Sequence, residues 1–423
     1  MKAFWHTGTV SPSTSAVRYC WVAGGRDTTW GSQESWGGAS GNNGRSVPLT
    51  EDITVTKLTV WLATAPGTSK SWDFTFRDDQ VSTAATVNIS GTNTSGQWTG
   101  SVNVTAGSLV SMMSTPTGTP AATGNMSYVI EYTTGGDYFL MVAGVETAAS
   151  GNGVFYMQAS GCSGRGPTGT ATTFYEVCPI GMTVTKAAFS SQFTTNAGSN
   201  SYVMCLRKNN TTDSDTITLT GTGQPVVASI TSFAVAAGDT INTKVNPSAS
   251  AAWTTYATCY TCTPDTVGDI PMMYASTRLV QNTTSYEGPQ AFGSDANWGA
   301  TEANVQYRMP SGTLKWLYFW LATAPGGSAS RFIGSRINAG ATTLGAMATS
   351  AATAANNTTD TVAVAEGDLL SVQNIPGNGP SDSAIAFSLV LNMLQTVSGT
   401  MDSIVMKAHT ASLTGSETLT GAL

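Results

Sequence analysis

Twice in this chain the same seven residues occur in the same order, first as Trp61-Leu62-Ala63-Thr64-Ala65-Pro66-Gly67 and again as Trp320-Leu321-Ala322-Thr323-Ala324-Pro325-Gly326. The two copies lie 259 residues apart in a chain of 423 residues, and a match of this length does not arise by chance. At half that distance Thr54-Val55-Thr56-Lys57 reappears as Thr183-Val184-Thr185-Lys186. A fixed period indicates a tandem array, here of three units of about 130 residues.

Other features recur with the same period in all three copies. Each copy has an arginine at the end of an apolar run, and later a tight glycine turn between two strand-like segments. These marker residues are Arg77, Arg207 and Arg336 for the arginines, and Gly107, Gly238 with Asp239, and Gly367 with Asp368 for the turns. The first copy departs from the Gly-Asp pattern because Ser108 follows its glycine.

The expected domain boundaries follow from the segments that open and close each copy. Each copy opens with an apolar segment, at residues 21–24, 141–144 and 273–276, and closes with an alternating one, at residues 128–132, 256–260 and 385–391. We therefore expect an N-terminal extension at 1–17, units at 18–135, 136–266 and 267–393, and a C-terminal extension at 394–423. Only a few residues separate consecutive units, so we expect them to pack against one another.

Each unit is expected to be all-β. Apolar and polar residues alternate in short runs such as 53–60, and clusters of Gly, Pro, Asn and Ser separate the runs every eight to twelve residues or so. This pattern favours a β-sandwich, and about eight strands in such a unit suit a jelly roll. The Ala-rich stretch 341–357 contains several threonines, which weaken a helix, so we interpret it as a loop or a strand.

The Gly-Asp turn carries a resemblance to a known family. A strand, a Gly-Asp turn and a strand late in a β unit of this size resemble the Gly-Asp hairpin of tumour-necrosis-factor-like jelly rolls, including the trimeric heads of bacterial-spore and phage surface proteins. Both residues tolerate the positive φ of hairpin turns. The tandem array and the low charge also resemble tailed-bacteriophage virion proteins. This resemblance implies tandem jelly rolls that serve as a decoration, fibre or tail component.

Composition restricts the partners. Hydrophobic residues make up 41% of the chain and charged residues only 10%, with a net charge of −7. The 18 Lys and Arg residues are scattered, so we expect no nucleic-acid partner, because phosphate binding needs clustered positive charge. No apolar run is long enough to cross a bilayer, and the first residues do not resemble a signal peptide. We therefore expect no membrane contact, synthesis in the host cytoplasm, and assembly into the virion.

The six cysteines are unevenly spaced, and two of them, Cys259 and Cys262, have the spacing of a zinc or redox pair. A zinc ribbon needs a second such pair, and a redox site needs a following helix. On a strand, residues three apart point to opposite faces. We therefore expect buried thiols and no metal or cofactor, with a local disulfide as the alternative.

The chain offers few groups for catalysis. Its two histidines, His6 and His409, lie in the expected extensions, which disfavours a serine-type triad. A glycosidase needs two carboxylates. The candidate pairs are Asp78 with Asp79 and Asp213 with Asp215. Turn formation explains both pairs, so we expect no catalytic residue and no enzymatic activity.

Aromatic and arginine side chains are the remaining candidates for contacts. We interpret the three marker arginines as structural residues at a strand end or at a contact between units. Trp61 and Trp320 are expected in the core or at a subunit contact. Three further tryptophans lie in Gly-rich loops, where an aromatic ring would form a protein interface or stack on a sugar. They are Trp30, Trp36 and Trp298, and Trp36-Gly37 is taken as the counterpart of Trp298-Gly299.

These observations predict a structural protein of a bacteriophage virion that acts through contacts with capsid or tail subunits. We expect a homo-oligomer, with a trimer favoured, although three units in one chain can also build a threefold head. The alternative is a carbohydrate-binding adhesin or receptor-binding tip protein that contacts a cell-surface glycan. A glycan hydrolase is the third hypothesis, and it requires two carboxylates in one cleft.

Overall fold

The computed structural model is built almost entirely of β-strands, which confirms the all-β prediction. It describes residues 1–8, 11–23, 30–32, 34, 45–145, 153–163, 169, 175–193, 201–220, 226–247, 253–280, 282–289 and 298–393. Within these ranges the helical structure consists of a single short turn, η2 (Glu302–Asn304). None of the described helical structure is long and apolar enough to cross a membrane. The expected C-terminal extension at 394–423 lies outside the described residues.

The first unit is a sandwich of two antiparallel sheets. One sheet has the order β1-β9-β4-β7, and the other has the order β2-β8-β5-β6 with β3 also paired to β8. The strands are β1 (Lys2–Gly8), β2 (Arg18–Cys20), β3 (Val47–Pro48), β4 (Ile53–Leu62), β5 (Gly67–Asp78), β6 (Val81–Gly91), β7 (Ser95–Val104), β8 (Leu109–Thr117) and β9 (Met126–Thr134).

The second unit repeats this arrangement with sheets β12-β10-β20-β14-β18 and β11-β19-β15-β16, to which β13 and β17 also pair. The parallel strand β12 covers the edge of β10. The strands are β10 (Phe139–Val145), β11 (Phe155–Met157), β12 (Gly161–Ser163), β13 (Glu176–Val177), β14 (Met182–Phe193), β15 (Ser201–Lys208), β16 (Thr212–Asp213), β17 (Ile217–Thr220), β18 (Val226–Val235), β19 (Thr240–Pro247) and β20 (Trp253–Pro264).

The third unit has sheets β21-β29-β24-β27 and β22-β28-β25-β26, with β23 paired to β28. The Ala-rich stretch 341–357 falls mainly in β26 and β27, so it is strand rather than helix. The strands are β21 (Asp269–Val280), β22 (Ser285–Glu287), β23 (Tyr307–Arg308), β24 (Gly312–Leu321), β25 (Ser330–Ile337), β26 (Gly340–Thr349), β27 (Ala354–Val364), β28 (Leu369–Gly377) and β29 (Ser383–Asn392).

All three units have jelly-roll topology. Leaving aside the short strands β3, β12, β13 and β23, and counting β16 and β17 as one, each unit has eight strands. Their order is first-eighth-third-sixth in one sheet and second-seventh-fourth-fifth in the other. This is the order produced when a long hairpin folds over into two Greek keys. We call the sheet with the first and last strands the inner sheet, and the other one the outer sheet.

The first unit begins earlier than the sequence analysis places it. Strand β1 lies within residues 1–17, which we took as an extension, and it pairs along its full length with β9. The opening strands β10 and β21 pair with β20 and β29 in the same way. Residues 21–24, expected to open the first unit, follow β2 instead, because the apolar run Phe4-Trp5 supplies the edge strand of the inner sheet.

The glycine turns connect the two sheets of each sandwich. Gly107, Gly238 and Gly367 have φ values of +91°, +89° and +86°, as the expected turn requires. The strands on either side belong to different sheets, however, so the turn is not the hairpin that we expected. Asp239 and Asp368 are not among the residues with positive φ. Their side chains instead accept hydrogen bonds from the backbone N–H groups of Ala236 and Ala365, at 2.8 and 2.7 Å.

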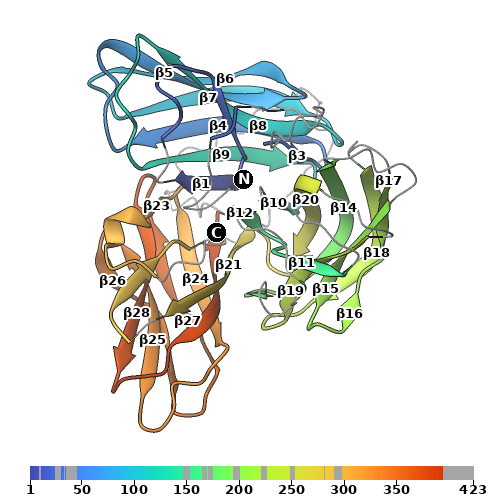
Figure 1. Cartoon of the computed structure of the whole chain (residues 1–423), viewed down its shortest axis with the longest axis vertical. Helices are drawn as coiled ribbons and strands as arrows, with labels where there is room; N and C mark the ends of the chain where they lie inside the picture. Colours follow the sequence, from blue (N-terminus) through green and yellow to red (C-terminus); the bar gives the residue numbers. More distant parts are fainter. Residues whose placement is uncertain are drawn as a thin grey trace, which may run out of the picture.

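The three units form a closed ring around a common centre (Figure 1). Strand β3 of the first unit packs on β10, β14 and β20 of the second, and β13 of the second packs on β21, β24 and β29 of the third. Strand β23 of the third unit then packs on β1 and β9 of the first, which closes the ring. Each unit therefore presents the same short strand to the inner sheet of the next, as in a cyclic trimer.

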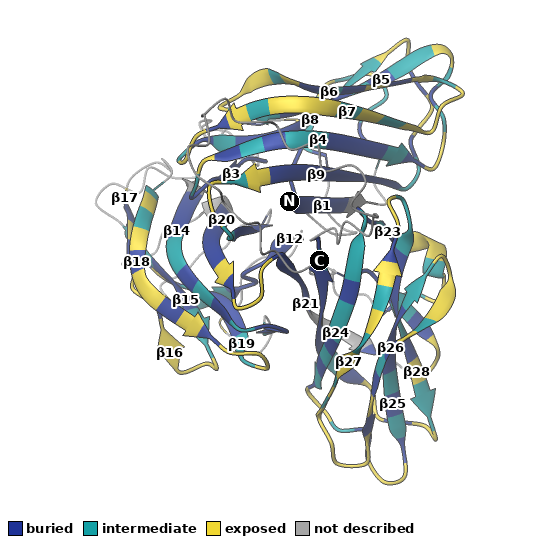
Figure 2. Ribbon diagram, turned by 180° about the vertical axis from the view of Figure 1, so that it is seen from behind, coloured by how far each residue is buried: buried dark blue, intermediate teal, exposed yellow. Residues whose placement is uncertain are grey.

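The apolar core crosses the unit boundaries. One cluster joins the cores of the second and third units and includes Trp5 and Val129 of the first unit. A second cluster joins the core of the first unit to Leu140 and Cys259 of the second. Figure 2 shows buried residues concentrated in the inner strands around the centre and exposed residues along the outer strands and loops. The first and last strands of each inner sheet are thus covered on both faces, by their own outer sheet and by neighbouring units, while β7, β18 and β27 at the far edge keep exposed residues.

Candidate functional site

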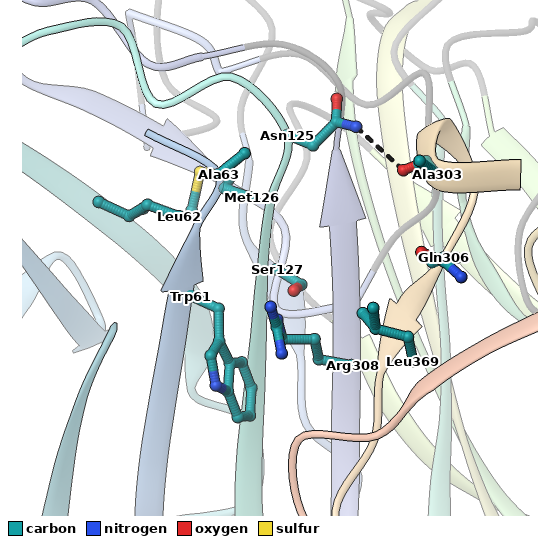
Figure 3. Close-up of a pocket in the computed structure, with 10 residues that line it drawn as sticks. All are labelled: Trp61, Leu62, Ala63, Asn125, Met126, Ser127, Ala303, Gln306, Arg308 and Leu369. Carbon is teal, nitrogen blue, oxygen red and sulfur yellow. Dashed lines mark hydrogen bonds between the residues drawn. The ribbon is translucent and has the colours of Figure 1, made fainter. Parts of the chain in front are cut away.

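A pocket lies between the first and third units, where β23 approaches β4 and β9 (Figure 3). It has a volume of about 230 Å³. The first unit contributes Trp61, Asn125 and Ser127 to its wall, and the third unit contributes Gln306 and Arg308. Two exposed residues, Ala63 and Ala303, stand at its rim.

The alternation of β4 places Trp61 in this pocket. Val60 and Leu62 point into the sandwich core and are buried, so Trp61 between them points out of the sandwich and is half-buried. The guanidinium carbon of Arg308 lies 5.7 Å from the centroid of the Trp61 ring. This cation–π contact joins the two units and fixes the orientation of both side chains.

Arg308 has no acidic partner among the described residues. Its Nη1 donates a hydrogen bond of 3.0 Å to the carbonyl oxygen of Gly367, and partial burial lowers its pKa. The neighbouring carboxylate of Glu366 instead binds the Nζ of Lys57 at 2.7 Å and the amide of Gln97 at 3.0 Å. Arg308 therefore brings a positive charge to the pocket that no carboxylate of the described residues balances.

The other polar groups of the pocket are amides and a hydroxyl. The Nδ2 of Asn125 donates a hydrogen bond of 3.2 Å to the carbonyl oxygen of Ala303, which links the rims of the two units. Figure 3 shows the guanidinium of Arg308 pointing across the pocket toward Trp61 and Ser127. The residues that the structure describes in the wall include no carboxylate, thiol or imidazole. This set of groups suits the binding of an anionic, hydrogen-bonding ligand and offers no group for proton transfer.

The two equivalent contacts of the ring lack this combination. The strand pairings place Pro48 and Val177 where the third unit has Arg308. They also place Ser190 and Trp320 where the first unit has Trp61. Packing between units therefore does not require an arginine at this position.

At the contact between the second and third units an aromatic side chain takes the place of the arginine. Tyr175, which precedes β13, lies against Trp320 with ring centroids 6.3 Å apart in an edge-on arrangement. Trp61 and Trp320 thus lie at contacts between units of the same chain, and whether either also reaches a separate subunit stays a prediction. Sequence reasoning did not identify Arg308, because its importance depends on a tryptophan 247 positions away.

The marker arginines lie on the outer sheets and make contacts within their own units. Each guanidinium carbon lies 5.7 Å from the ring centroid of a tyrosine: Tyr19 for Arg77, Tyr156 for Arg207 and Tyr286 for Arg336. The Nε atoms of Arg77 and Arg336 also donate hydrogen bonds of 2.9 Å to Glu34 and Glu302. None of these contacts joins two units, so the arginines hold each outer sheet together.

Two of the three loop tryptophans are core residues. Trp30 is 8% exposed and packs against Phe74 and Tyr128, and Trp298 is 3% exposed and packs against Tyr274 and Phe387. Neither ring can stack on a sugar or reach a partner protein, which corrects the expectation of a surface role. Their glycine-rich sequence surroundings suggested exposure, but both rings pack into the sandwich core.

The pairing of the loops also differs from the expected one. Gly31 and Gly299 each form a β-bridge to a tyrosine of the adjacent short strand, Tyr19 and Tyr286. Trp30-Gly31 is therefore the structural counterpart of Trp298-Gly299, in place of Trp36-Gly37. Trp36 lies outside the described residues.

The two cysteines of the candidate pair are buried in the core, and the aspartates of one candidate pair make contacts within their own unit. Cys259 and Cys262 are free and buried, and they belong to different apolar clusters on opposite faces of β20. Burial raises the pKa of the Cys259 thiol to about 12. Asp213 binds the Nζ of Lys244 at 2.6 Å, and Asp215 accepts a 2.6 Å hydrogen bond from a backbone N–H. In the described part of the chain, no group of three His, Cys, Asp or Glu side chains could hold a metal ion.

Comparisons with known proteins leave the site unassigned. No protein-family model matches the sequence, and no curated protein matches it. The crystal structure of dimeric latent PorU from Porphyromonas gingivalis aligns with 82% of this chain at 12% sequence identity and a TM-score of 0.20. The alignment covers 32% of that protein, about a third of its length. At this TM-score the likeness carries no argument about fold or function.

Proposed function

We propose that this protein is a structural component of a bacteriophage virion, as a decoration protein, head fibre or tail appendage, and that it acts through contacts with other virion proteins. The observation that supports this most is the closed ring of three jelly rolls. It buries the central strands of all three inner sheets and leaves the outer sheets and the grooves between units for contacts. Such a ring is a rigid platform for recognition.

The ring also bears on the expected oligomer. Three units of one chain already close a pseudo-threefold head, so a homotrimer is not needed to complete it. Further association would use the outer sheets or the ends of the ring. We keep capsid or tail subunits as the proposed partners.

The proposal is tested by quantitative mass spectrometry of virus particles purified from the sample that supplied the sequence. We expect the chain to co-purify with particles at a fixed ratio to the major capsid protein. A ratio near one copy per capsid subunit would indicate a decoration role, and a few copies per particle would indicate a fibre or tail role. Absence from purified particles would refute the proposal.

A receptor-binding tip that contacts a cell-surface glycan is the second candidate function. The buried Trp30 and Trp298 do not support it. The pocket of Trp61 and Arg308 does, because it combines an aromatic ring, amides and a cation that has no acidic partner among the described residues in one accessible hollow. A glycan-binding role is compatible with a place on the virion, and it is tested separately below.

A further inference from the structure

The pocket of Trp61 and Arg308 has features that the ring itself does not need. At the two equivalent contacts the arginine position is occupied by Pro48 and Val177, and apolar clusters cross both contacts without it. A partly buried cation without an acidic partner is costly to maintain. Its presence at one contact of three indicates a role other than packing.

The guanidinium of Arg308 has donors to spare. A guanidinium has five N–H donors, and among the described residues only the carbonyl oxygen of Gly367 accepts from it. The nearby carboxylates are already engaged, because Glu366 and Glu131 both bind the Nζ of Lys57, at 2.7 and 3.1 Å. The remaining donors are matched best by a carboxylate, which an arginine binds through two parallel hydrogen bonds.

The size and lining of the pocket limit what can bring that carboxylate. A volume of about 230 Å³ lies below the 300–1,000 Å³ or so of pockets for drug-sized ligands, and it suits one ring-sized group. The indole of Trp61 provides an apolar face, while Asn125, Gln306 and Ser127 provide amides and a hydroxyl. A pyranose ring has an apolar face, hydroxyl groups at its edge and, in acidic sugars, a carboxylate.

We infer that this pocket binds one acidic sugar residue, with the carboxylate on Arg308, the ring beside Trp61 and the hydroxyl groups at the amide edge. The inference rests on the glycan-binding candidate function and is independent of whether the protein belongs to a virion. It locates the site at a contact between units, so only the closed ring forms it.

Saturation-transfer NMR titrations of the full chain test this inference. The probes are methyl β-D-glucuronide, the neutral methyl β-D-glucoside, and N-acetylglycine as a carboxylate without a sugar ring. We expect the glucuronide to bind about tenfold or more tightly than either of the other probes, since it alone matches both the charge and the ring. Binding should weaken as salt is added.

Arg308→Gln should weaken glucuronide binding by about tenfold or more, and Arg308→Lys should retain part of it, because lysine keeps the charge but lacks the planar fork. Arg18→Gln is the matched control. It removes the same charge from an arginine of β2 that does not line the pocket, and it should bind like the unaltered chain. Thermal unfolding of each variant shows that the fold is retained.

Three outcomes would overturn the inference. These are equal glucuronide binding by Arg308→Gln and the unaltered chain, equal binding of glucoside and glucuronide, or no binding of the glucuronide at all. Binding of N-acetylglycine as tight as that of the glucuronide would show that the pocket recognises a carboxylate without a sugar ring, and this would also overturn the inference. None of these results would affect the mass-spectrometry test, so failure of this inference is distinguishable from failure of the virion proposal.

Discussion

Individual residues show how the three units diverged while the same positions stayed paired. His6 stacks on Tyr128 with ring centroids 4.5 Å apart, and its Nε2 lies 3.8 Å from the sulfur of Cys20. The strand pairings place Tyr274 at the position of His6 in the third unit, where it stacks on Phe387 at 4.6 Å. The histidine, expected in an extension, is therefore a core residue of the inner sheet.

Acid stability should depend on His6. Burial lowers its pKa from 6.5 to about 3, so the folded protein keeps the imidazole neutral while the unfolded chain protonates it. The unfolded state then binds more protons, and stability present above pH 6.5 is lost as the pH falls toward 3. Between pH 7 and pH 4 the free energy of unfolding of the unaltered chain should fall by about 3 kcal/mol more than that of His6→Phe, as measured by urea unfolding.

Tyr128→Phe provides the control for this prediction. It removes the hydrogen bond from the tyrosine hydroxyl to the carbonyl oxygen of Trp21 and keeps an aromatic ring against the buried imidazole of His6. Its destabilisation should be the same at pH 7 and pH 4. If His6→Phe behaves in the same pH-independent way, the histidine does not titrate as the structure implies.

Glu176 should have the opposite dependence on pH. It is buried in the second unit and accepts hydrogen bonds from the backbone N–H groups of Ala159 and Ser160, at 2.6 and 3.0 Å. Burial raises its pKa from 4.5 to about 8, so stability present below pH 4.5 is lost as the pH rises toward 8. As the pH rises from 5 to 8, the free energy of unfolding of Glu176→Gln should increase by about 3 kcal/mol relative to that of the unaltered chain, as measured by urea unfolding. A difference in unfolding free energy that stays constant over this range would contradict the prediction.

The first copy lacks the Gly-Asp pattern because its carboxylate and its hydrogen-bond donor occupy each other's positions at the turn. In the other two units the aspartate after the glycine accepts a hydrogen bond from an asparagine amide, Asn209 at 2.6 Å or Asn338 at 2.8 Å. In the first unit the carboxylate belongs to Asp79, which stands at the position of the asparagine in the other units. The hydroxyl of Ser108, the residue after the glycine, donates a hydrogen bond to it at 3.3 Å. The turn keeps one carboxylate and one donor, but the two have changed places.

At the scale of the elements, the third of the eight strands in each unit has a β-bulge next to a lysine. These strands are β4, β14 and β24. The register shifts occur beside Lys57, Lys186 and Lys315. Lys57 and Lys186 reach across to carboxylates of neighbouring units, Glu366 and Glu51, while Lys315 binds Asp269 of its own unit at 2.9 Å. A bulge re-aims a side chain, and here two lysines beside the bulges reach the preceding unit of the ring.

Strand β10 shows how closely two units approach. A Cβ atom added to Gly144 would lie 2.9 Å from ring carbons of Trp21, which is fully buried and belongs to the first unit. Gly144→Ala should therefore destabilise the chain by about 1–3 kcal/mol through overpacking, measured by denaturant unfolding.

Gly153→Ala is the matched control, because a Cβ atom there meets no atom of the described residues within 4 Å. It should change the free energy of unfolding by less than about 0.5 kcal/mol. Equal stability of Gly144→Ala and Gly153→Ala would show that β10 and Trp21 do not pack as described.

At the scale of the whole molecule, the ring makes each unit depend on the other two. The strands β1, β10 and β21 meet at the centre, where Phe4, Leu140 and Ile270 line one small cavity of about 20 Å³. Removing the third unit exposes Trp5 and Trp61 of the first unit and Tyr175 of the second. Exposed apolar surface of this kind promotes self-association.

A chain ended at residue 266 should therefore differ from the full chain in two measurements. Calorimetry should give a midpoint at least about 5 °C lower, and light scattering should show association where the full chain is a monomer or a defined oligomer. If the shortened chain keeps the midpoint of the full chain and does not associate, the units are independent and the ring does not stabilise them.

The sequence by itself determined the fold class and the number of units. Alternation with a period of two identifies strands because successive side chains of a strand point to opposite faces, and this is a local property. Alternation together with the repeated residues therefore located β4, β14 and β24. It missed β1, because a short edge strand next to an irregular loop has no repeat marker, and it assigned Trp36-Gly37 to the place of Trp30-Gly31.

Only the tertiary structure decided which surfaces meet. The pocket depends on Trp61 and Arg308, which belong to strands in different units, and on a ring that brings the third unit back to the first. Neither residue is unusual in its own segment: one lies in a repeated strand and the other in a strand of two residues. Contacts between distant strands depend on how whole sheets pack, and strand periodicity carries no information about that arrangement.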